Sequence, residues 1–296
     1  MRQAGKRLPG AVLAGALLWM GIVLAACEAG TPTPPPTSTL PRTVAPSPTV
    51  NPVLPTLDPQ AAIGVNDATA AAVPNQGNTE GFVPLPPEEP FEVTASSDGL
   101  ELRGTLYRAA EEPTPAVLLL HMLGGERRDW LPLVTPLQQT GYTVLAVDLR
   151  GHGATGGGQD WELARQDTLD MLAALRQVDG VDPARVGVIG ASIGANLALV
   201  GCAADAACRT AVLLSPGLDY RGVTTAGAVT QLGERPLLIV ASEEDSYAAE
   251  SSQELDSLAA GPHQLVMLSG AGHGTRMFGP QPDLVDTILA WLARTL

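Results

Sequence analysis

Short, nearly uninterrupted apolar runs recur from residue 116 onward. They cover residues 116–120, 143–147, 185–190, 211–214, 236–240 and 264–268. Runs of this length are typical of strands that are buried on both faces of a parallel sheet. Between them lie segments in which apolar residues recur at intervals of three and four, the period of a helix. These segments include residues 160–178, 193–203, 248–259 and 282–295. The alternation predicts an α/β fold with a doubly wound, mostly parallel sheet and ligands at the carboxyl ends of its strands.

A different pattern precedes the parallel strands. In FEVTASSDGLELRGTLYR, residues 91–108, two stretches of alternating apolar and polar residues flank Asp98 and Gly99. An Asp-Gly pair between alternating stretches indicates a β-hairpin. We therefore expect antiparallel strands at the start of the domain.

The amino-terminal third does not resemble a packed domain. Its first ten residues carry positive charge, and the apolar run 11–26 is short for a bilayer span, as in an export signal. The sequence from Glu28 to about Pro90 is rich in Pro and Thr, with few large apolar residues. We therefore divide the chain into a signal peptide (1–26), a disordered tether (27–90) and one folded domain (91–296).

The leader ends in Leu24-Ala25-Ala26-Cys27, which resembles the lipobox of bacterial lipoproteins. The resemblance implies that Cys27 is lipidated and anchors the protein to the extracytoplasmic face of the cell membrane. The alternative is an uncleaved membrane helix that contains an ordinary cysteine. Both interpretations place the folded domain outside the cytoplasm.

Charge and cysteine content limit the possible partners. The formal net charge is −14, which argues against binding to nucleic acid, and no protein partner is implied. Cys202 and Cys208 are six positions apart and would form a disulfide in an oxidising compartment. Two buried free thiols are the alternative, and the spacing leaves both open.

A serine lies where a predicted strand meets a predicted helix. The sequence Gly190-Ala191-Ser192-Ile193-Gly194 follows the run VGVIG and precedes the helical ANLALVGC. A G-x-S-x-G at such a junction exposes the serine hydroxyl on a sharp turn. From about residue 91 onward the chain resembles the α/β-hydrolase family, particularly its dienelactone-hydrolase-like and small-esterase branches. The resemblance implies that Ser192 is a nucleophile.

The loop after residue 120 resembles a second family motif. His121-Met122-Leu123-Gly124-Gly125 is similar to the His-Gly-x-Gly-Gly loop that supplies an oxyanion-hole N–H, with Met122 in place of a glycine. The resemblance implies that the backbone N–H groups of Leu123 and Ile193 hold the oxyanion.

The same resemblance assigns an acid and a base. The strand and loop PLLIVASEED resemble the family's acid loop and point to Asp245, with Ser242 in place of a glycine and with Glu243 and Glu244 as alternatives. His273, between the last strand and the last helix, completes the order Ser, Asp, His. The other histidines receive non-catalytic roles: His121 and His152 structural, His263 on the surface.

These residues imply a serine hydrolase that cleaves small carboxylic esters through an acyl-enzyme, with no metal or cofactor. A peptidase or amidase would use the same three residues, and a surface binding protein would have lost the chemistry. Residues 215–235 are too few for a multi-helix lid, so we expect a minimal cap and an open, shallow site. Asp219, Tyr220 and Arg221 could line the entrance, but we favour the interpretation that they are polar loop residues.

Overall fold

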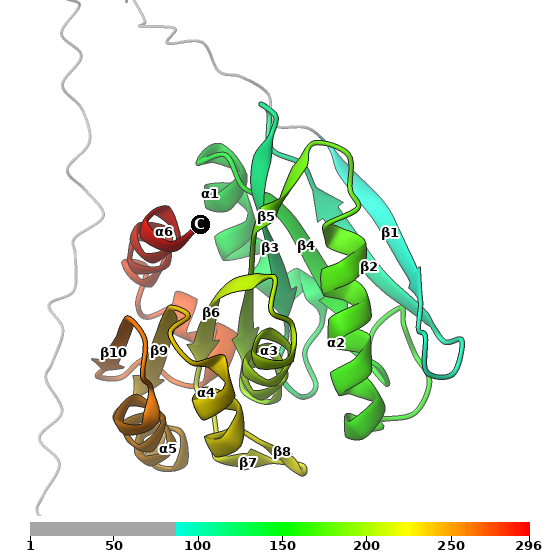
Figure 1. Cartoon of the computed structure of the whole chain (residues 1–296). Coiled ribbons are helices and arrows are strands. Elements are labelled where there is room, and N and C mark those ends of the chain that lie inside the picture. Colours follow the sequence, from blue (N-terminus) through cyan, green and yellow to red (C-terminus); the bar gives the residue numbers. More distant parts are fainter. Residues whose placement is uncertain (1–86) are drawn as a thin grey trace, which may run out of the picture. The chain divides into compact units, whose positions relative to one another are not determined.

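A computed structural model describes residues 87–296, which form an eight-stranded sheet with helices on both faces (Figure 1). The predicted signal peptide, Cys27 and nearly all of the predicted tether lie outside the described residues. Within residues 87–296 no helix is long and apolar enough to cross a membrane.

The domain opens with an antiparallel hairpin, as predicted. Strands β1 (Glu88–Thr94) and β2 (Glu101–Tyr107) pair along their full length. In the turn between them Gly99 has a φ of 79°, and its N–H donates to the Ala95 carbonyl at 2.9 Å. Because β1 begins at Glu88, the folded domain starts before the predicted boundary at residue 91. The acidic, proline-containing EEP at its start does not look like a strand, but pairing with β2 supplies its hydrogen bonds.

The remaining large strands form the parallel part of the sheet. They are β3 (Thr114–Leu120), β4 (Thr143–Asp148), β5 (Val181–Ala191), β6 (Cys208–Leu214), β9 (Leu237–Ser242) and β10 (His263–Leu268). The strand order is β1-β2-β4-β3-β5-β6-β9-β10, and only the β1–β2 and β2–β4 pairs of this sheet are antiparallel. Each predicted apolar run overlaps one strand, so the prediction of a mostly parallel sheet is confirmed.

Helices cover both faces of this sheet (Figure 1). On one face lie α2 (Trp161–Leu175), α3 (Ile193–Ala204), α4 (Ala226–Leu232) and α5 (Ser246–Leu258), and on the other lie α1 (Leu131–Gln139) and α6 (Leu284–Thr295). Alternate strand residues feed the two cores: Leu118 and Val188 belong to one, and Val117 and Ile189 to the other. This two-sided burial explains why the strands are continuously apolar.

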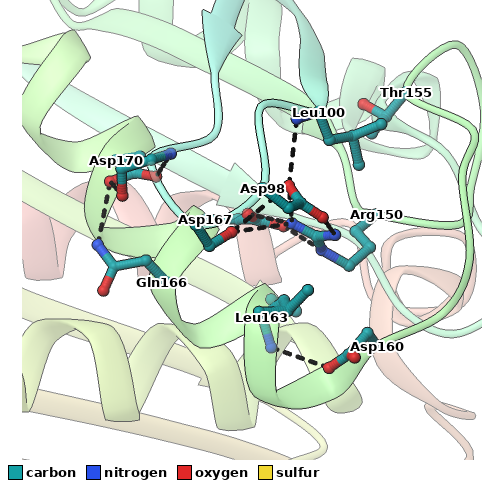
Figure 2. A network of polar contacts seen from close by, with 12 residues as sticks. Asp98, Leu100, Arg150, Thr155, Asp160, Leu163, Gln166, Asp167 and Asp170 are labelled. Atoms are coloured by element: carbon teal, nitrogen blue, oxygen red, sulfur yellow. Dashed lines mark hydrogen bonds and ion pairs between the residues drawn. The ribbon is translucent and has the colours of Figure 1, made fainter.

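A polar network joins the β1–β2 turn to helix α2 (Figure 2). The buried Arg150 guanidinium donates to both carboxylate oxygens of Asp167, at 2.8 and 2.7 Å, and to Asp98 Oδ2 at 2.7 Å. Asp170 accepts hydrogen bonds from the Ser96 backbone and side chain. Burial raises the pKa of Asp167 more than its hydrogen bonds with Arg150 lower it. The network thus fixes the hairpin through a buried ion pair.

The connection between β6 and β9 is short. It contains a small antiparallel hairpin, formed by β7 (Asp219–Tyr220) and β8 (Val223–Thr224), and the seven-residue helix α4. The predicted minimal cap is therefore confirmed. Elsewhere, α1 was not predicted because its sequence, LPLVTPLQQ, carries two prolines, one of them inside the helix.

Cys202 and Cys208 connect the end of α3 to the start of β6. Their sulfur atoms form a disulfide, so the structure contains the first of the two alternatives. Both residues are fully buried. The bond closes the loop that follows α3, the helix that begins directly after Ser192.

Candidate active site

Ser192 occupies a strained turn between β5 and α3. Its φ and ψ are 55° and −121°, a backbone conformation that residues other than glycine rarely adopt. A Cβ on Gly190 would lie 2.0 Å from the Gly194 carbonyl oxygen, and one on Gly194 would lie 2.3 Å from that of Leu120. Both neighbours must therefore be glycine for the turn to close. The Ser192 N–H donates to the Leu214 carbonyl at 2.8 Å, which ties the turn to β6.

The two predicted oxyanion-hole residues flank this turn. Ile193 is the first residue of α3, and Leu123 lies in the loop that follows β3. Among the backbone hydrogen bonds of residues 87–296, neither N–H has a protein acceptor. Both residues line the same cavity as Ser192. The cavity thus offers the backbone of a helix amino terminus and of a loop to a developing negative charge.

His121 supports the loop that carries Leu123. Its Nε2 accepts from the Leu149 N–H at 2.9 Å, so its proton is on Nδ1, which donates to the Met122 carbonyl at 2.7 Å. Burial lowers the pKa of this imidazole, which keeps it neutral. The ring of His152 meets it edge-on, with 5.0 Å between centroids. Both histidines thus have structural contacts, as expected, and neither lines the Ser192 cavity.

Met122, at the position of the family glycine, packs against the loop that carries His273. A Cβ on Gly274 would lie 3.0 Å from its sulfur, and Thr275 donates to the same atom at 3.8 Å. The larger side chain therefore joins the two loops of the site.

Asp245 and His273 come together at the carboxyl ends of β9 and β10. The Nδ1 atom of His273 lies 2.5 Å from Oδ2 of Asp245. Ser192 and His273 both line a cavity of about 310 Å³. Within residues 87–296 no direct hydrogen bond joins these two side chains. Such bonds are often long or poorly aligned before substrate binds.

Glu244 contacts the histidine loop rather than the histidine. It accepts from Ser242 Oγ at 2.7 Å and from the Gly270 N–H at 2.8 Å, and the hydrogen bond from Ser242 is the main reason that its pKa falls to about 2. Ser242 Oγ in turn accepts from the Ala271 N–H at 3.1 Å. The serine in place of a glycine thus serves the loop before His273. Glu243 has no side-chain hydrogen bond among the described residues, and His263 lies at the exposed edge strand.

The cavity wall corrects one interpretation. Tyr220 and Arg221 line the cavity beside Ser192, so treating them as loop residues away from the entrance was wrong; Asp219 is not part of the wall. Hydrogen bonds with the Asn196 side chain of α3 hold the β7–β8 hairpin beside the turn that contains Ser192. The Asn196 side chain donates to the Val223 carbonyl at 2.7 Å and accepts from the Gly217 N–H at 3.0 Å. Sequence patterns do not reveal such contacts.

Arg276 also lines the cavity and was not identified from the sequence. Its position, three residues after His273, was the available signal. With Arg221 it gives the wall two cations, and no Asp or Glu side chain belongs to that wall. This is the reverse of the chain as a whole, whose formal net charge is −14.

Comparison with known proteins identifies the fold. Residues 117–234 match the sequence profile of the alpha/beta hydrolase family. An uncharacterised protein of Mycobacterium tuberculosis is 28% identical over 216 residues, 66% of this chain and 73% of that protein. An esterase of Pyrococcus furiosus has a TM-score of 0.61 and 19% identity, covering 71% of this chain and 90% of its own. Residues 117–234 thus match this family, and the domain has the α/β-hydrolase fold.

A second solved structure supports the same assignment. A dienelactone hydrolase of Anabaena variabilis has a TM-score of 0.56 and 21% identity, covering 71% of this chain and 99% of its own. In this α/β-hydrolase domain, Ser192, Asp245 and His273 follow β5, β9 and β10, so all three lie at the carboxyl end of the sheet. That is where open α/β sheets bind their ligands.

Proposed function

We propose that this α/β hydrolase is a serine hydrolase that cleaves carboxylic esters. The observation that supports this most is the 2.5 Å contact between His273 and Asp245 at the wall of the cavity that Ser192 lines. With its Nδ1 proton directed at Asp245, the imidazole has Nε2 free to accept the Ser192 proton. Asp245 fixes this tautomer and stabilises the imidazolium that forms.

The proposed reaction has two halves. Ser192 Oγ attacks the ester carbonyl as its proton passes to His273, and the N–H groups of Leu123 and Ile193 hold the resulting oxyanion. The C–O bond to the leaving group then breaks, and His273 returns its proton to the departing oxygen. Water attacks the acyl-enzyme by the same route, which releases the acid and restores Ser192.

Small or exposed esters are the proposed substrates. The cap consists of α4 and the β7–β8 hairpin, whose strands are two residues long each. Leu123, which lines the cavity, is 39% exposed, and both observations support an open site. An amidase would use the same residues and must expel a poorer leaving group. We therefore rank esters first.

A panel of 4-nitrophenyl esters beside aminoacyl 4-nitroanilides tests this ranking. We expect ester hydrolysis by the wild type and none above background by Ser192→Ala, with both proteins showing the same circular dichroism. Cleavage of the anilides alone would show that the protein is an amidase and not an esterase. A folded wild type that cleaves neither would favour the surface binding protein.

We also propose that the protein is lipid-anchored through Cys27 on the extracytoplasmic face of the membrane. The leader and its lipobox-like end support this, as does the Cys202–Cys208 disulfide, because disulfides persist in oxidising compartments. Cells that express the full chain and receive labelled palmitate should give a labelled wild type and an unlabelled Cys27→Ser variant. Equal labelling of both would contradict the anchor.

A further inference from the structure

Tyr220 enters the Ser192 cavity from the β7–β8 hairpin. Its ring meets the ring of His273 edge-on, with 6.4 Å between centroids and an interplanar angle of 84°. The same ring also meets the ring of Tyr247, with 5.5 Å between centroids. The phenol therefore borders both the proposed nucleophile and the proposed base.

The backbone beside Tyr220 is held on several sides. The Tyr247 hydroxyl accepts from the Asp219 N–H at 2.9 Å and donates to the Asp219 carbonyl at 3.0 Å. Arg165 donates to the Gly222 carbonyl at 2.6 Å, and Asn196 binds Val223 as described above. A group held in this way acts without reorganisation when charge develops near it.

The Tyr220 hydroxyl remains a hydrogen-bond donor at all ordinary pH values. Burial raises its pKa most, and the negative charge of Asp245 raises it further. The nearby Ser192 hydroxyl, which lines the same cavity, lowers the pKa by less than these effects raise it. The donor is thus protonated, half-buried and adjacent to Ser192.

We propose that Tyr220 donates a hydrogen bond to the leaving-group oxygen when the tetrahedral intermediate breaks down. This rests on the proposed esterase function. His273 has to deliver its proton to that oxygen, so the oxygen must lie between Ser192 and the imidazole, which are the two groups that Tyr220 borders. The carbonyl oxygen instead points to the N–H groups of Leu123 and Ile193.

The step balances without a further reactant. The bond between the carbonyl carbon and the leaving oxygen breaks, and its electron pair stays on that oxygen. The imidazolium of His273 supplies the proton, and Tyr220 keeps its own proton throughout. Such a donor matters most when the departing oxygen is strongly basic, so the site is suited to esters of aliphatic alcohols.

The test is the dependence of kcat/KM on leaving-group pKa, measured with acetate esters from 4-nitrophenyl and phenyl to trifluoroethyl and ethyl. Because kcat/KM reports the acylation half, the common acetyl-enzyme does not affect it. For Tyr220→Phe we expect a change of less than about threefold on 4-nitrophenyl acetate and a loss of about 10- to 100-fold on ethyl acetate. The plot of log kcat/KM against leaving-group pKa should become steeper.

Tyr142→Phe is the matched control, because it removes the hydroxyl of a buried tyrosine that does not line the Ser192 cavity. We expect it to leave the slope unchanged. An unchanged slope in Tyr220→Phe, or an equal loss on every ester, would overturn the leaving-group role while leaving the esterase intact. A wild type without activity on any ester would overturn the esterase itself.

Discussion

Nδ1 of His273 and Oδ2 of Asp245 are 2.5 Å apart, although 28 positions separate the two residues in the sequence. The sheet brings them together, because β9 and β10 are parallel neighbours whose carboxyl ends meet at one edge. The contact selects one of three adjacent acids. Glu244 has other partners, and among residues 87–296 the Glu243 side chain makes no hydrogen bond with His273.

Replacing Asp245 by Asn should lower kcat on 4-nitrophenyl acetate by about 10³- to 10⁴-fold, because the amide no longer fixes the productive tautomer of His273. Glu244→Gln is the matched control, and its loss should stay below about tenfold. Circular dichroism should show the same fold for both variants. Equal losses in the two variants would contradict the assignment of the acid.

Glu244 should instead affect stability in acid. Its folded pKa of about 2 lies below the ordinary 4.5, so its hydrogen bonds to Ser242 and Gly270 stabilise the fold above about pH 4.5. This contribution is lost as the pH falls toward 2. The wild-type Tm should therefore fall more than the Tm of Glu244→Gln between about pH 5 and pH 2.5. Parallel Tm curves would show that this carboxylate contributes nothing.

Much of the fold follows from local patterns, and most of the candidate site follows from the resemblance to α/β-hydrolase motifs. Continuous apolar runs predict strands that are buried on both faces. The glycines at 190 and 194 predict a tight turn around Ser192, because a larger residue at either position would clash with the backbone. Tyr220, Arg221 and Arg276 were missed or misinterpreted because their placement depends on non-local contacts, such as that between Asn196 and Val223. A short polar hairpin has no periodicity from which its direction can be predicted.

The start of the domain shows the same limit. The first three residues of its first strand, Glu88 to Pro90, lie in the stretch assigned to the tether, and the pairing of Glu88 with Tyr107 and of Pro90 with Thr105 makes them part of the strand. The ion pair between Arg150 and Asp167 is likewise a long-range contact that cannot be predicted from the sequence around either residue.

Breaking that ion pair should destabilise the domain more than breaking an exposed one. Figure 2 shows Arg150 paired with both Asp167 and Asp98. The side chains of Arg150 and Asp167 are 4% and 8% exposed, so Asp167→Asn leaves a buried guanidinium only partly paired. We expect a loss of about 3 kcal/mol in the free energy of unfolding by urea. Glu162→Gln, which breaks an ion pair whose acid is 78% exposed, should cost less than about 1 kcal/mol. Similar losses of unfolding free energy in the two variants would argue against the Arg150–Asp167 network as the contact that holds the β1–β2 hairpin.

The cationic cavity wall should favour esters with a negative charge. We expect a higher kcat/KM for mono-4-nitrophenyl adipate than for the neutral 4-nitrophenyl hexanoate, which has the same acyl length. Because an exposed cation contributes at most about 1 kcal/mol, Arg276→Gln should reduce this ratio by up to about fivefold. Arg128→Gln removes an exposed arginine that is outside the cavity wall and should leave the ratio unchanged. A ratio insensitive to Arg276 would show that the guanidinium does not reach the substrate.

The central claim is that His273 activates the Ser192 hydroxyl. Its most direct test is the reaction of the protein with a fluorophosphonate, followed by peptide mass spectrometry. We expect one adduct, on the peptide that contains Ser192, with no adduct in Ser192→Ala and labelling at least about 10²-fold slower in His273→Ala. A folded wild type that remains unmodified, under conditions in which a serine esterase reacts completely, would contradict the account.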